Sequence, residues 1–394
     1  MRTPMSKAAA LGASYIVAAR RTALGRPGGL HATRRIESLA APVVRAALQD
    51  AGLQPDRVEQ IILGNTTAGG NPARIVGLAA GLGDGTAALT VDRQCASGLD
   101  AILIGMRAVA LGEASVVVAG GAESISTAPW RVARPRNLFQ TPRFLGLEAD
   151  AGEARDASPS AAASEALARR LGISRQRQDS YTLGSHLKAE RAIGERRFVG
   201  EIVPLRMAGE EARDEAADVA GIDDLEEMEP LLPPDGTVTA GNSSMLQDGA
   251  AIVVIVSAAV HAELGSPQAM RLVASSILGM GAGEEARAPV AALEKLLRPN
   301  GANPRNELAL VEMSEGSAAQ ALAVRDAFDL SEDALNPDGG ALVRGYPLGA
   351  ASAVSVTRLF TRMVRGRNGA APGLGAVTQG ATGGLGVAAL FSAD

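Results

Sequence analysis

Hydrophobic positions along this chain fall into short unbroken runs that alternate with longer stretches of helical spacing. Four early runs predict strands, at residues 14–19, 58–63, 88–91 and 115–119. Helical spacing predicts helices over 36–52, 71–82 and 100–111. The last of these carries only Asp100 and Arg107 as charged residues, so we expect it to be buried on all sides. The strand, polar turn, helix and strand over 88–119 therefore predict a βαβ unit.

A second unit of the same kind lies near the C-terminus. The turn NPDGGALVRGYPLG leads into the apolar helical segment AASAVSVTRLFTRMV, and residues 373–378 and 386–391 predict two closing strands. Similar units at corresponding places predict an internal duplication, although Ala-rich helices also look alike through composition alone.

The segment between the two units differs in composition. It contains an aromatic and basic cluster made of Trp130, Arg131, Arg134, Arg136, Phe139 and Arg143. Residues 161–171 and 175–193 predict amphipathic helices, and residues 214–270 contain no Lys or Arg. We predict a loop domain inserted at 123–248 that covers one face of the first half. The two halves are then 14–122 with 249–265, and 266–394.

Composition and charge exclude several classes of protein. A net charge of −5 argues against broad binding to nucleic-acid phosphates, and 46% hydrophobic residues fit a globular chain. Neither a secretory signal nor an apolar run of bilayer length is evident, so we expect a cytoplasmic protein without membrane contact. A single cysteine excludes an intrachain disulfide and a cysteine-based metal cage, and only His31, His186 and His261 supply imidazole.

That single cysteine, Cys95, is the candidate nucleophile. It lies where a strand turns into a helix, and there the amide N–H groups and the helix dipole favour a thiolate. The same amides can hold the oxyanion of a tetrahedral intermediate. We expect the small residues Ser97 and Gly98 beside it to allow close approach of a ligand. The alternative is an ordinary buried cysteine in the core.

Ordered segments along the chain resemble those of a known family. VDRQCASGLDAI followed by VVVAGGAESIS is similar to the nucleophile region of the thiolases, the acetyl-CoA acetyltransferase branch of the thiolase superfamily. GNTTAGGNPAR, DGTVTAGNSSMLQDGAAIVV, VEMSEGSAAQALAV and GGLGVAALF also match in order. The resemblance covers nearly the whole chain. It implies an α/β fold of five layers, αβαβα, with two duplicated halves and an inserted loop domain.

The chain departs from the family at three catalytic positions. The resemblance implies a histidine in a Gly-His-Pro turn, which here is Tyr346, and an asparagine before a glutamate, which here is Ser314 before Glu315. The family's second cysteine falls at Gly380. Because a phenol ordinarily titrates near pH 10, about 3.5 units above imidazole, Tyr346 is a poor base at neutral pH but can still donate a proton. We therefore expect Claisen condensation and thiolysis to be suppressed.

Other implied contacts concern the thioester. The resemblance implies an oxyanion hole from the backbone at Cys95 and Thr382, and substrate contacts at Ser244 and Gly383. The family's basic residues near the CoA nucleotide have no match, because residues 214–234 are acidic. The arginine cluster at 131–143 can instead meet CoA or an acyl-carrier protein, or it is simply solvated surface or an oligomer contact.

These observations predict an atypical thiolase-like acyltransferase that accepts an acyl group on Cys95 from a CoA or carrier thioester. CoA enters as substrate, and no metal or other cofactor is expected. One alternative is a CoA-ester aldolase or lyase in which Tyr346 carries the proton. Another is a binding subunit without catalysis. The resemblance also implies a homodimer or a homotetramer.

Overall fold

The computed structural model describes residues 12–135, 137, 139–145, 159–205, 213–215, 224–281, 283–298, 308–366 and 373–393 of the 394-residue chain. Its first half builds five strands, which are β1 (Ser14–Thr22), β2 (Gln60–Gly64), β3 (Ala87–Val91), β4 (Val116–Glu123) and β8 (Gly249–Ser257). They lie in the order β3-β2-β4-β8-β1. Strand β2 runs parallel to β3 and β4, whereas β8 runs antiparallel to both β4 and β1.

The second half repeats this topology. Its strands are β9 (Met270–Gly279), β10 (Leu308–Met313), β11 (Leu374–Ala381) and β12 (Leu385–Ala393), in the order β10-β11-β12-β9. Strand β10 is parallel to β11, and β12 is antiparallel to β11 and β9. A single parallel bridge from Val311 to Leu335 occupies the place that β3 has in the first half. Pairing of Tyr15 with Arg271 and of Ile16 with Met270 joins the halves into one mixed sheet.

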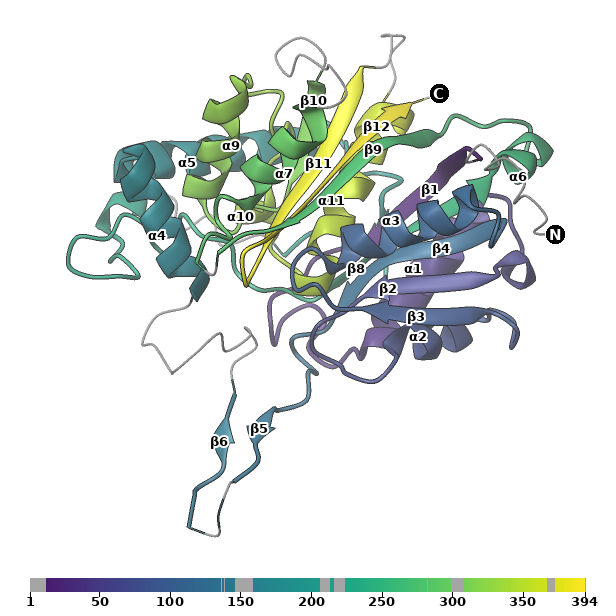
Figure 1. The fold of residues 1–394 in the computed structure, drawn as a ribbon, viewed down its shortest axis with the longest axis horizontal. Helices are drawn as coiled ribbons and strands as arrows, with labels where there is room; N and C mark the ends of the chain where they lie inside the picture. The colour runs from purple at the N-terminus through teal and green to yellow at the C-terminus, as the bar shows by residue number, and fades with distance from the viewer. Residues whose placement is uncertain are drawn as a thin grey trace, which may run out of the picture.

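Helices form three layers around the two parts of this sheet (Figure 1). Helices α1 (Ile36–Asp50) and α2 (Pro72–Ala80) cover the outer face of the first half, and α7 (Ala288–Leu297) and α9 (Ala318–Phe328) that of the second. Between them, α3 (Ser97–Ala110) and α11 (Ala351–Phe360) share one core with both halves. Strand β8 is an unbroken apolar run because helices cover it on both faces. The predicted five-layer α/β fold is confirmed.

The inserted segment lies between β4 and β8 and contains β5 (Val132–Ala133), β6 (Arg143–Phe144), α4 (Pro159–Leu171), α5 (Arg175–Gly194) and β7 (Ile202–Val203). Its helices pack on α9 and α10 (Ala341–Arg344), which belong to the second half (Figure 1). The expectation that the insertion covers the first half is therefore wrong for these helices. The reason is apolar burial, because Leu167 and Ile173 join the core of α7 and α9.

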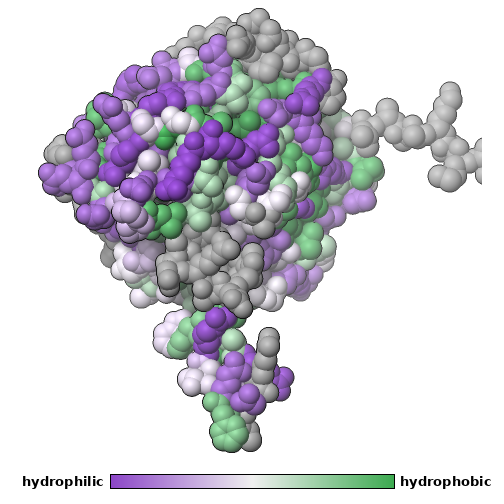
Figure 2. All heavy atoms as spheres, turned by 60° about the vertical axis from the view of Figure 1, so that its left-hand side comes forward, coloured by the Kyte–Doolittle hydropathy of each residue, from purple (hydrophilic) through white to green (hydrophobic). Residues whose placement is uncertain are grey.

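The hairpin β5-β6 projects from the body of the molecule (Figure 1), and Figure 2 shows hydrophilic and hydrophobic residues mixed along it. Trp130 and Phe139 are 85% and 97% exposed, and the Trp130 ring contacts Phe144 edge to face. Arg131 donates to the carbonyl oxygen of Thr66, whereas Arg136 lies outside the described residues. Of the predicted acidic stretch at 214–234, residues 216–223 lie outside them as well.

The remaining elements are short. They are α6 (Ala258–Glu263), the 3-10 turns η1 (Pro55–Arg57), η3 (Leu225–Glu227) and η5 (Leu348–Ala350), and the π-helical turn η6 (Thr361–Arg365). Within the described parts of the chain, every helix is too short or too polar to cross a bilayer.

Candidate active site

Cys95 lies in the sharp turn between β3 and α3, and its residue is 8% exposed. Gln94 immediately before it adopts a φ of 50°, in the left-handed region that non-glycine residues rarely occupy. Strain of this kind is stored where a side chain must be presented in a fixed direction. The thiol is thus held at the start of a buried helix, in the same apolar cluster as Tyr346.

Hydrogen bonds within the turn explain why α3 begins at Ser97, three residues before the predicted start. The Ser97 hydroxyl accepts from the backbone N–H of Arg93 at 2.8 Å and donates to the carbonyl oxygen of Gln94 at 2.5 Å. Arg93 also pairs with the buried Asp100 one turn into the helix, at 2.6 Å. The polar residues of this segment therefore shape the turn itself.

Helix α11 packs against α3 at Gly98, three residues after Cys95. A Cβ atom on Gly98 would lie 2.9 Å from both the Cβ and the backbone N of Ala353, so glycine is required for the two central helices to touch. Ser352 of the same helix donates to the carbonyl oxygen of Cys95 at 3.1 Å and accepts from the Leu99 N–H at 2.9 Å. Gly98 therefore serves the packing of the two halves, and the close approach of a ligand to Cys95 stays a prediction.

Tyr346 precedes η5 in a turn tied to the end of the inserted segment. Its backbone N–H donates to the carbonyl oxygen of Met245 at 3.0 Å, and its carbonyl oxygen accepts from the Gln247 N–H at 3.0 Å. The side chain is 7% exposed. Its hydroxyl oxygen lies 2.9 Å from Nε2 of Gln379 on β11. An amide N–H can only donate, so the phenol accepts from Gln379 and directs its own proton elsewhere.

Gln379 is a residue that the sequence did not reveal, whereas its neighbour Gly380 was the expected cysteine position. Successive residues of β11 face opposite sides of the sheet. The Gln379 side chain faces Tyr346, and a Cβ atom on Gly380 would point to the other side, 2.5 Å from the carbonyl oxygen of Glu285. Backbone therefore closes the space that a side chain at Gly380 would need.

Comparison with known proteins agrees with this architecture. A model of the thiolase N-terminal domain matches residues 14–259, and a model of the thiolase C-terminal domain matches residues 267–393. The chain belongs to the thiolase family. A relative from Staphylococcus aureus strain MRSA252, named "Putative acetyl-CoA C-acetyltransferase VraB", is 34% identical over 384 residues, which are 96% of this chain and 99% of the relative.

Solved structures show the same likeness. The crystal structure of the Bacillus anthracis acetyl-CoA acetyltransferase matches with a TM-score of 0.89 at 30% identity, over 98% of this chain and 100% of that one. Human mitochondrial 3-ketoacyl-CoA thiolase in complex with CoA matches with a TM-score of 0.88 at 30% identity, over 99% and 100%. The protein is therefore an acetyl-CoA acetyltransferase-like member of the thiolases.

In this thiolase, Ser314, Glu315 and Ser244 form one connected group. The Ser314 hydroxyl donates to the carbonyl oxygen of Ala351 at 2.8 Å and lies 3.0 Å from the Ser355 hydroxyl. The backbone oxygen of Ser314 accepts from Gln379 at 3.2 Å. The Ser244 hydroxyl donates to the backbone oxygen of Glu315 at 2.5 Å, so it lies against this segment.

The hairpin between β11 and β12 carries Thr382 and Gly383. Thr382 is 7% exposed, and its neighbour Ala381 belongs to the apolar cluster that contains Cys95 and Tyr346. Gly383 adopts a φ of 90°, and a Cβ atom there would meet no described atom within 4 Å. The hairpin tip is therefore open on the side of Gly383.

A buried carboxylate joins the two halves next to the turn that carries Tyr346. Glu123 at the end of β4 accepts hydrogen bonds from the backbone N–H of Gly349 at 3.0 Å, from the Asn65 side chain at 2.7 Å and from the Thr66 hydroxyl at 2.7 Å. Burial raises the pKa of Glu123 despite these donors. The turn after Tyr346 is thereby held against the loop that follows β2.

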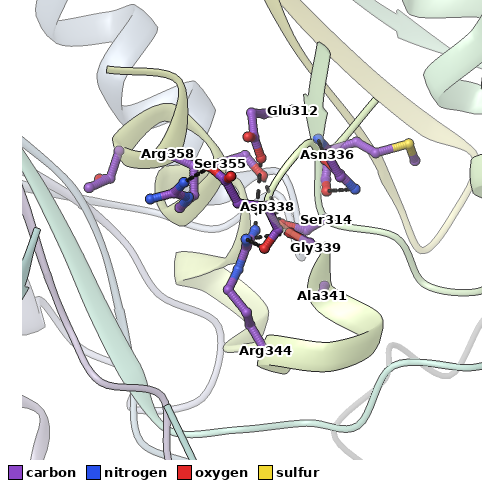
Figure 3. A network of polar contacts seen from close by, with 12 residues as sticks. Glu312, Ser314, Asn336, Asp338, Gly339, Ala341, Arg344, Ser355 and Arg358 are labelled. Atoms are coloured by element: carbon purple, nitrogen blue, oxygen red, sulfur yellow. Dashed lines mark hydrogen bonds and ion pairs between the residues drawn. The ribbon is translucent and has the colours of Figure 1, made fainter. Parts of the chain in front are cut away.

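A second buried network lies beside Ser314 (Figure 3). Arg358 of α11 pairs with Glu201 and Asp338, all three with fully buried side chains. Burial alone would raise the pKa of Glu201, but the guanidinium groups of Arg358 and Arg21 lower it to about 2. Glu312 on β10 lies 3.8 Å from Nη2 of Arg344, and burial raises its pKa to about 7. No local motif in the sequence predicts this network of ion pairs.

The three histidines lie outside the apolar cluster around Cys95. His31 contacts the carbonyl oxygen of Ala23 at 2.9 Å, and burial lowers its pKa. His261 contacts the carbonyl oxygen of Pro267 at 2.8 Å, and His186 lies on α5. All three are within the described residues, and the hydrogen bonds of His31 and His261 go to Ala23 and Pro267, outside the turns that carry Cys95 and Tyr346.

Proposed function

We propose that this thiolase is an acyltransferase that takes an acyl group from a thioester onto Cys95, and that its condensation and thiolysis activities are weak. The Cys95 sulfur attacks the thioester carbonyl carbon, a new carbon–sulfur bond forms, and the bond to the leaving thiol breaks. The thiol proton of Cys95 passes to the departing sulfur. The observation that carries the proposal is the strained turn at Gln94, which presents Cys95 at the start of a buried helix.

Backbone donors support acylation independently of the changed side chains. The oxyanion in the proposed step is held by N–H groups at Cys95 and Thr382, and main-chain donors persist when neighbouring side chains differ. By contrast, loss of a general base costs roughly 10²–10⁴ in rate, and loss of an oxyanion donor about 10²–10³. Tyr346 and Ser314 replace the histidine and asparagine that the family resemblance implies, so the enolate chemistry is the part that suffers.

Tyr346 acts in this proposal as a proton donor toward the acyl group. Its oxygen accepts from Gln379, which supports a phenol proton aimed away from β11. A neutral phenol can stabilise a developing negative charge by hydrogen bonding without leaving its protonated state near pH 7.

The proposed acyl donor is a CoA thioester. Two of the similar structures, from human mitochondria and from Ascaris suum, are described as complexes with CoA or coenzyme A. Ser244 lies against the segment that begins at Ser314, which supports a contact with the donor's pantetheine arm. An acyl-carrier protein that docks on the arginine-bearing hairpin is the other candidate donor.

Intact-protein mass spectrometry after mixing with acetyl-CoA tests the proposal. We expect the wild type to gain the mass of one acetyl group and Cys95→Ser to lose that stable thioester. Because Cys95 is the chain's single cysteine, no other thiol can carry the label. Absence of an adduct with acetyl-CoA, longer acyl-CoA and acyl-carrier donors would contradict it.

Two alternatives are separated by paired variants. A CoA-ester aldolase or lyase that uses Tyr346 predicts that Tyr346→Phe abolishes turnover while Cys95→Ala does not. The hydrogen bond from Gln379 to the phenol supports a proton-carrying role for Tyr346 over a purely structural one. A binding subunit predicts thioester binding without turnover, unaffected by either variant.

We also propose that the chain assembles as a homodimer or homotetramer. Strand β3 is the edge of the sheet, and its Leu89 is 47% exposed. Ile75 and Leu78 on the adjacent α2 are 49% and 48% exposed. An edge strand flanked by apolar side chains is a template for pairing with another chain.

A further inference from the structure

A cavity of about 270 Å³ lies between α5 and the segment from α9 to Leu335. This volume is slightly below that of typical small-ligand pockets, which begin at about 300 Å³, so the cavity suits only a small ion or compact metabolite. On α5, Arg177, Tyr181 and Lys188 recur at helical spacing and share one face toward it. Arg325 of α9 lies opposite. This face comes forward in Figure 2, where hydrophilic side chains gather on it.

The charged lining is mostly positive. Arg177, Lys188 and Arg325 supply three cations, whereas Glu332 supplies the one carboxylate among the lining residues. Burial lowers the pKa of Lys188, and the nearby carboxylates of Asp333, Glu332 and Glu315 oppose that shift. Its ammonium group donates to the carbonyl oxygen of Leu335 at 3.2 Å and to that of Glu332, both neutral acceptors.

The ion pairs at the rim are weak enough to exchange for a ligand. The Arg325 guanidinium lies 3.9 Å from Glu332, whose side chain is 84% exposed. Arg177 pairs with Asp326 at 2.9 Å, and both side chains are more than 40% exposed, at 42% and 45%. Exposed pairs of this kind contribute little, because solvent screens them. A carboxylate or phosphate in the cavity would meet the same guanidinium groups in a less exposed place.

Tyr181 connects the cavity to the segment that contains Ser314 and Glu315. Its hydroxyl donates to Oε1 of Glu315 at 3.2 Å, and burial raises its pKa well above 10, so it stays a neutral donor. Oε2 of Glu315 accepts from the Ala341 N–H at 2.6 Å, and its backbone oxygen accepts from Ser244. A ligand that contacts Tyr181 therefore adjoins a residue bonded to the segment beside Ser314.

We propose that this cavity is a binding site for a small oxyanion, a carboxylate- or phosphate-bearing metabolite, held by Lys188 and Arg325. Lys188 lies on α5 and Arg325 on α9, whereas Cys95 lies in the turn between β3 and α3, so the proposed anion site and the acyl site are built from different elements. Binding at it does not depend on the proposed acyl transfer.

Isothermal titration calorimetry of the full chain at constant ionic strength tests this site, with inorganic phosphate and malonate as separate probes. We expect one of the two anions to bind with one site per chain. Lys188→Met and Arg325→Gln should each weaken that binding about tenfold or more, because each removes a charge-assisted contact. The control Arg298→Gln removes a 79% exposed cation on α7 and should leave the affinity unchanged.

Two results would overturn the proposal: no binding of either anion, or an unchanged affinity in Arg325→Gln. Arg325 makes only half-exposed contacts in the described structure, so that variant decides the question even where Lys188→Met folds poorly. The titration reads binding alone, and a negative result leaves the acylation of Cys95 to its own test.

Discussion

The structure predicts by how much the buried carboxyl group of Glu312 changes the free energy of unfolding. Its side chain is fully buried on β10, and among the described residues neither carboxylate oxygen has a hydrogen-bond partner. Burial raises its pKa from 4.5 to about 7, against the opposing effect of Arg344 and Arg358. Each pKa unit corresponds to about 1.4 kcal/mol, so ionised Glu312 costs the native state about 3 kcal/mol.

The sign of the pH dependence follows from proton binding. Between pH 4.5 and about 7, native Glu312 keeps a proton that the unfolded chain has released. The contribution of this group to stability therefore falls as pH rises through that window, and the loss is complete above it. Glu312→Gln is neutral at every pH, so its free energy of unfolding should exceed that of the wild type by about 3 kcal/mol near pH 8. Near pH 5 the two should be almost equal.

Urea denaturation at matched protein concentration measures this difference at the two pH values. Glu113→Gln, at an exposed carboxyl group after α3, is the matched control and should show no growing advantage with pH. A Glu312→Gln advantage that stays constant between the two pH values, or shrinks toward pH 8, would refute the reasoning. The carboxylate would then be stabilised in the native state by Arg344.

Three further predictions concern the site and the assembly. Gly380→Cys should destabilise the fold by about 1–3 kcal/mol and give no thiolysis, because its Cβ meets the Glu285 carbonyl oxygen at 2.5 Å. Chemical denaturation and a thiolysis assay check this, and vigorous turnover would contradict it. Ser352→Ala should lower the free energy of unfolding by about 2 kcal/mol in the same denaturation measurement, because two buried hydrogen bonds are lost. An unchanged denaturation midpoint would show that Ser352 does not stabilise the turn at Cys95. Leu89→Arg should yield monomers in light scattering, and a persistent oligomer would show that β3 is not the interface.

The elements of this fold were predictable where one periodicity dominates. The helix that follows Cys95 is apolar on nearly all sides because it lies between the two parts of the sheet, and this apolar pattern is visible in the sequence. The same holds for the strand and turn around Cys95. The place of the inserted helices was not predictable. The apolar face of α4 does not identify its partner surface, and the buried face of α5 is mostly polar, with Gln178, Asp179, Thr182 and Ser185.

The polar contacts were harder to predict than the elements. Gln379 meets Tyr346 across 33 positions of sequence, and Arg358 meets Glu201 across 157. No local motif joins residues so far apart, so only the folded chain brings them together. The family resemblance indicates Gly380 as the position of interest. Side chains alternate along β11, however, so it is the neighbouring Gln379 whose side chain faces Tyr346.

The way the halves meet explains why the chain can change its proton-handling residues and keep its nucleophile. Three features hold Cys95 in place. They are the strained backbone of Gln94, the hydrogen bond from the Ser352 hydroxyl to the carbonyl oxygen of Cys95, and the contact of Gly98 with α11. None of these contacts uses the side chain of Tyr346 or Ser314. A substitution at either position therefore alters the chemistry around the sulfur while the turn that presents it stays fixed. In the proposed mechanism, acyl acceptance and carbon–carbon bond formation therefore depend on different parts of the structure, and acylation of the wild type without thiolysis would reveal this separation.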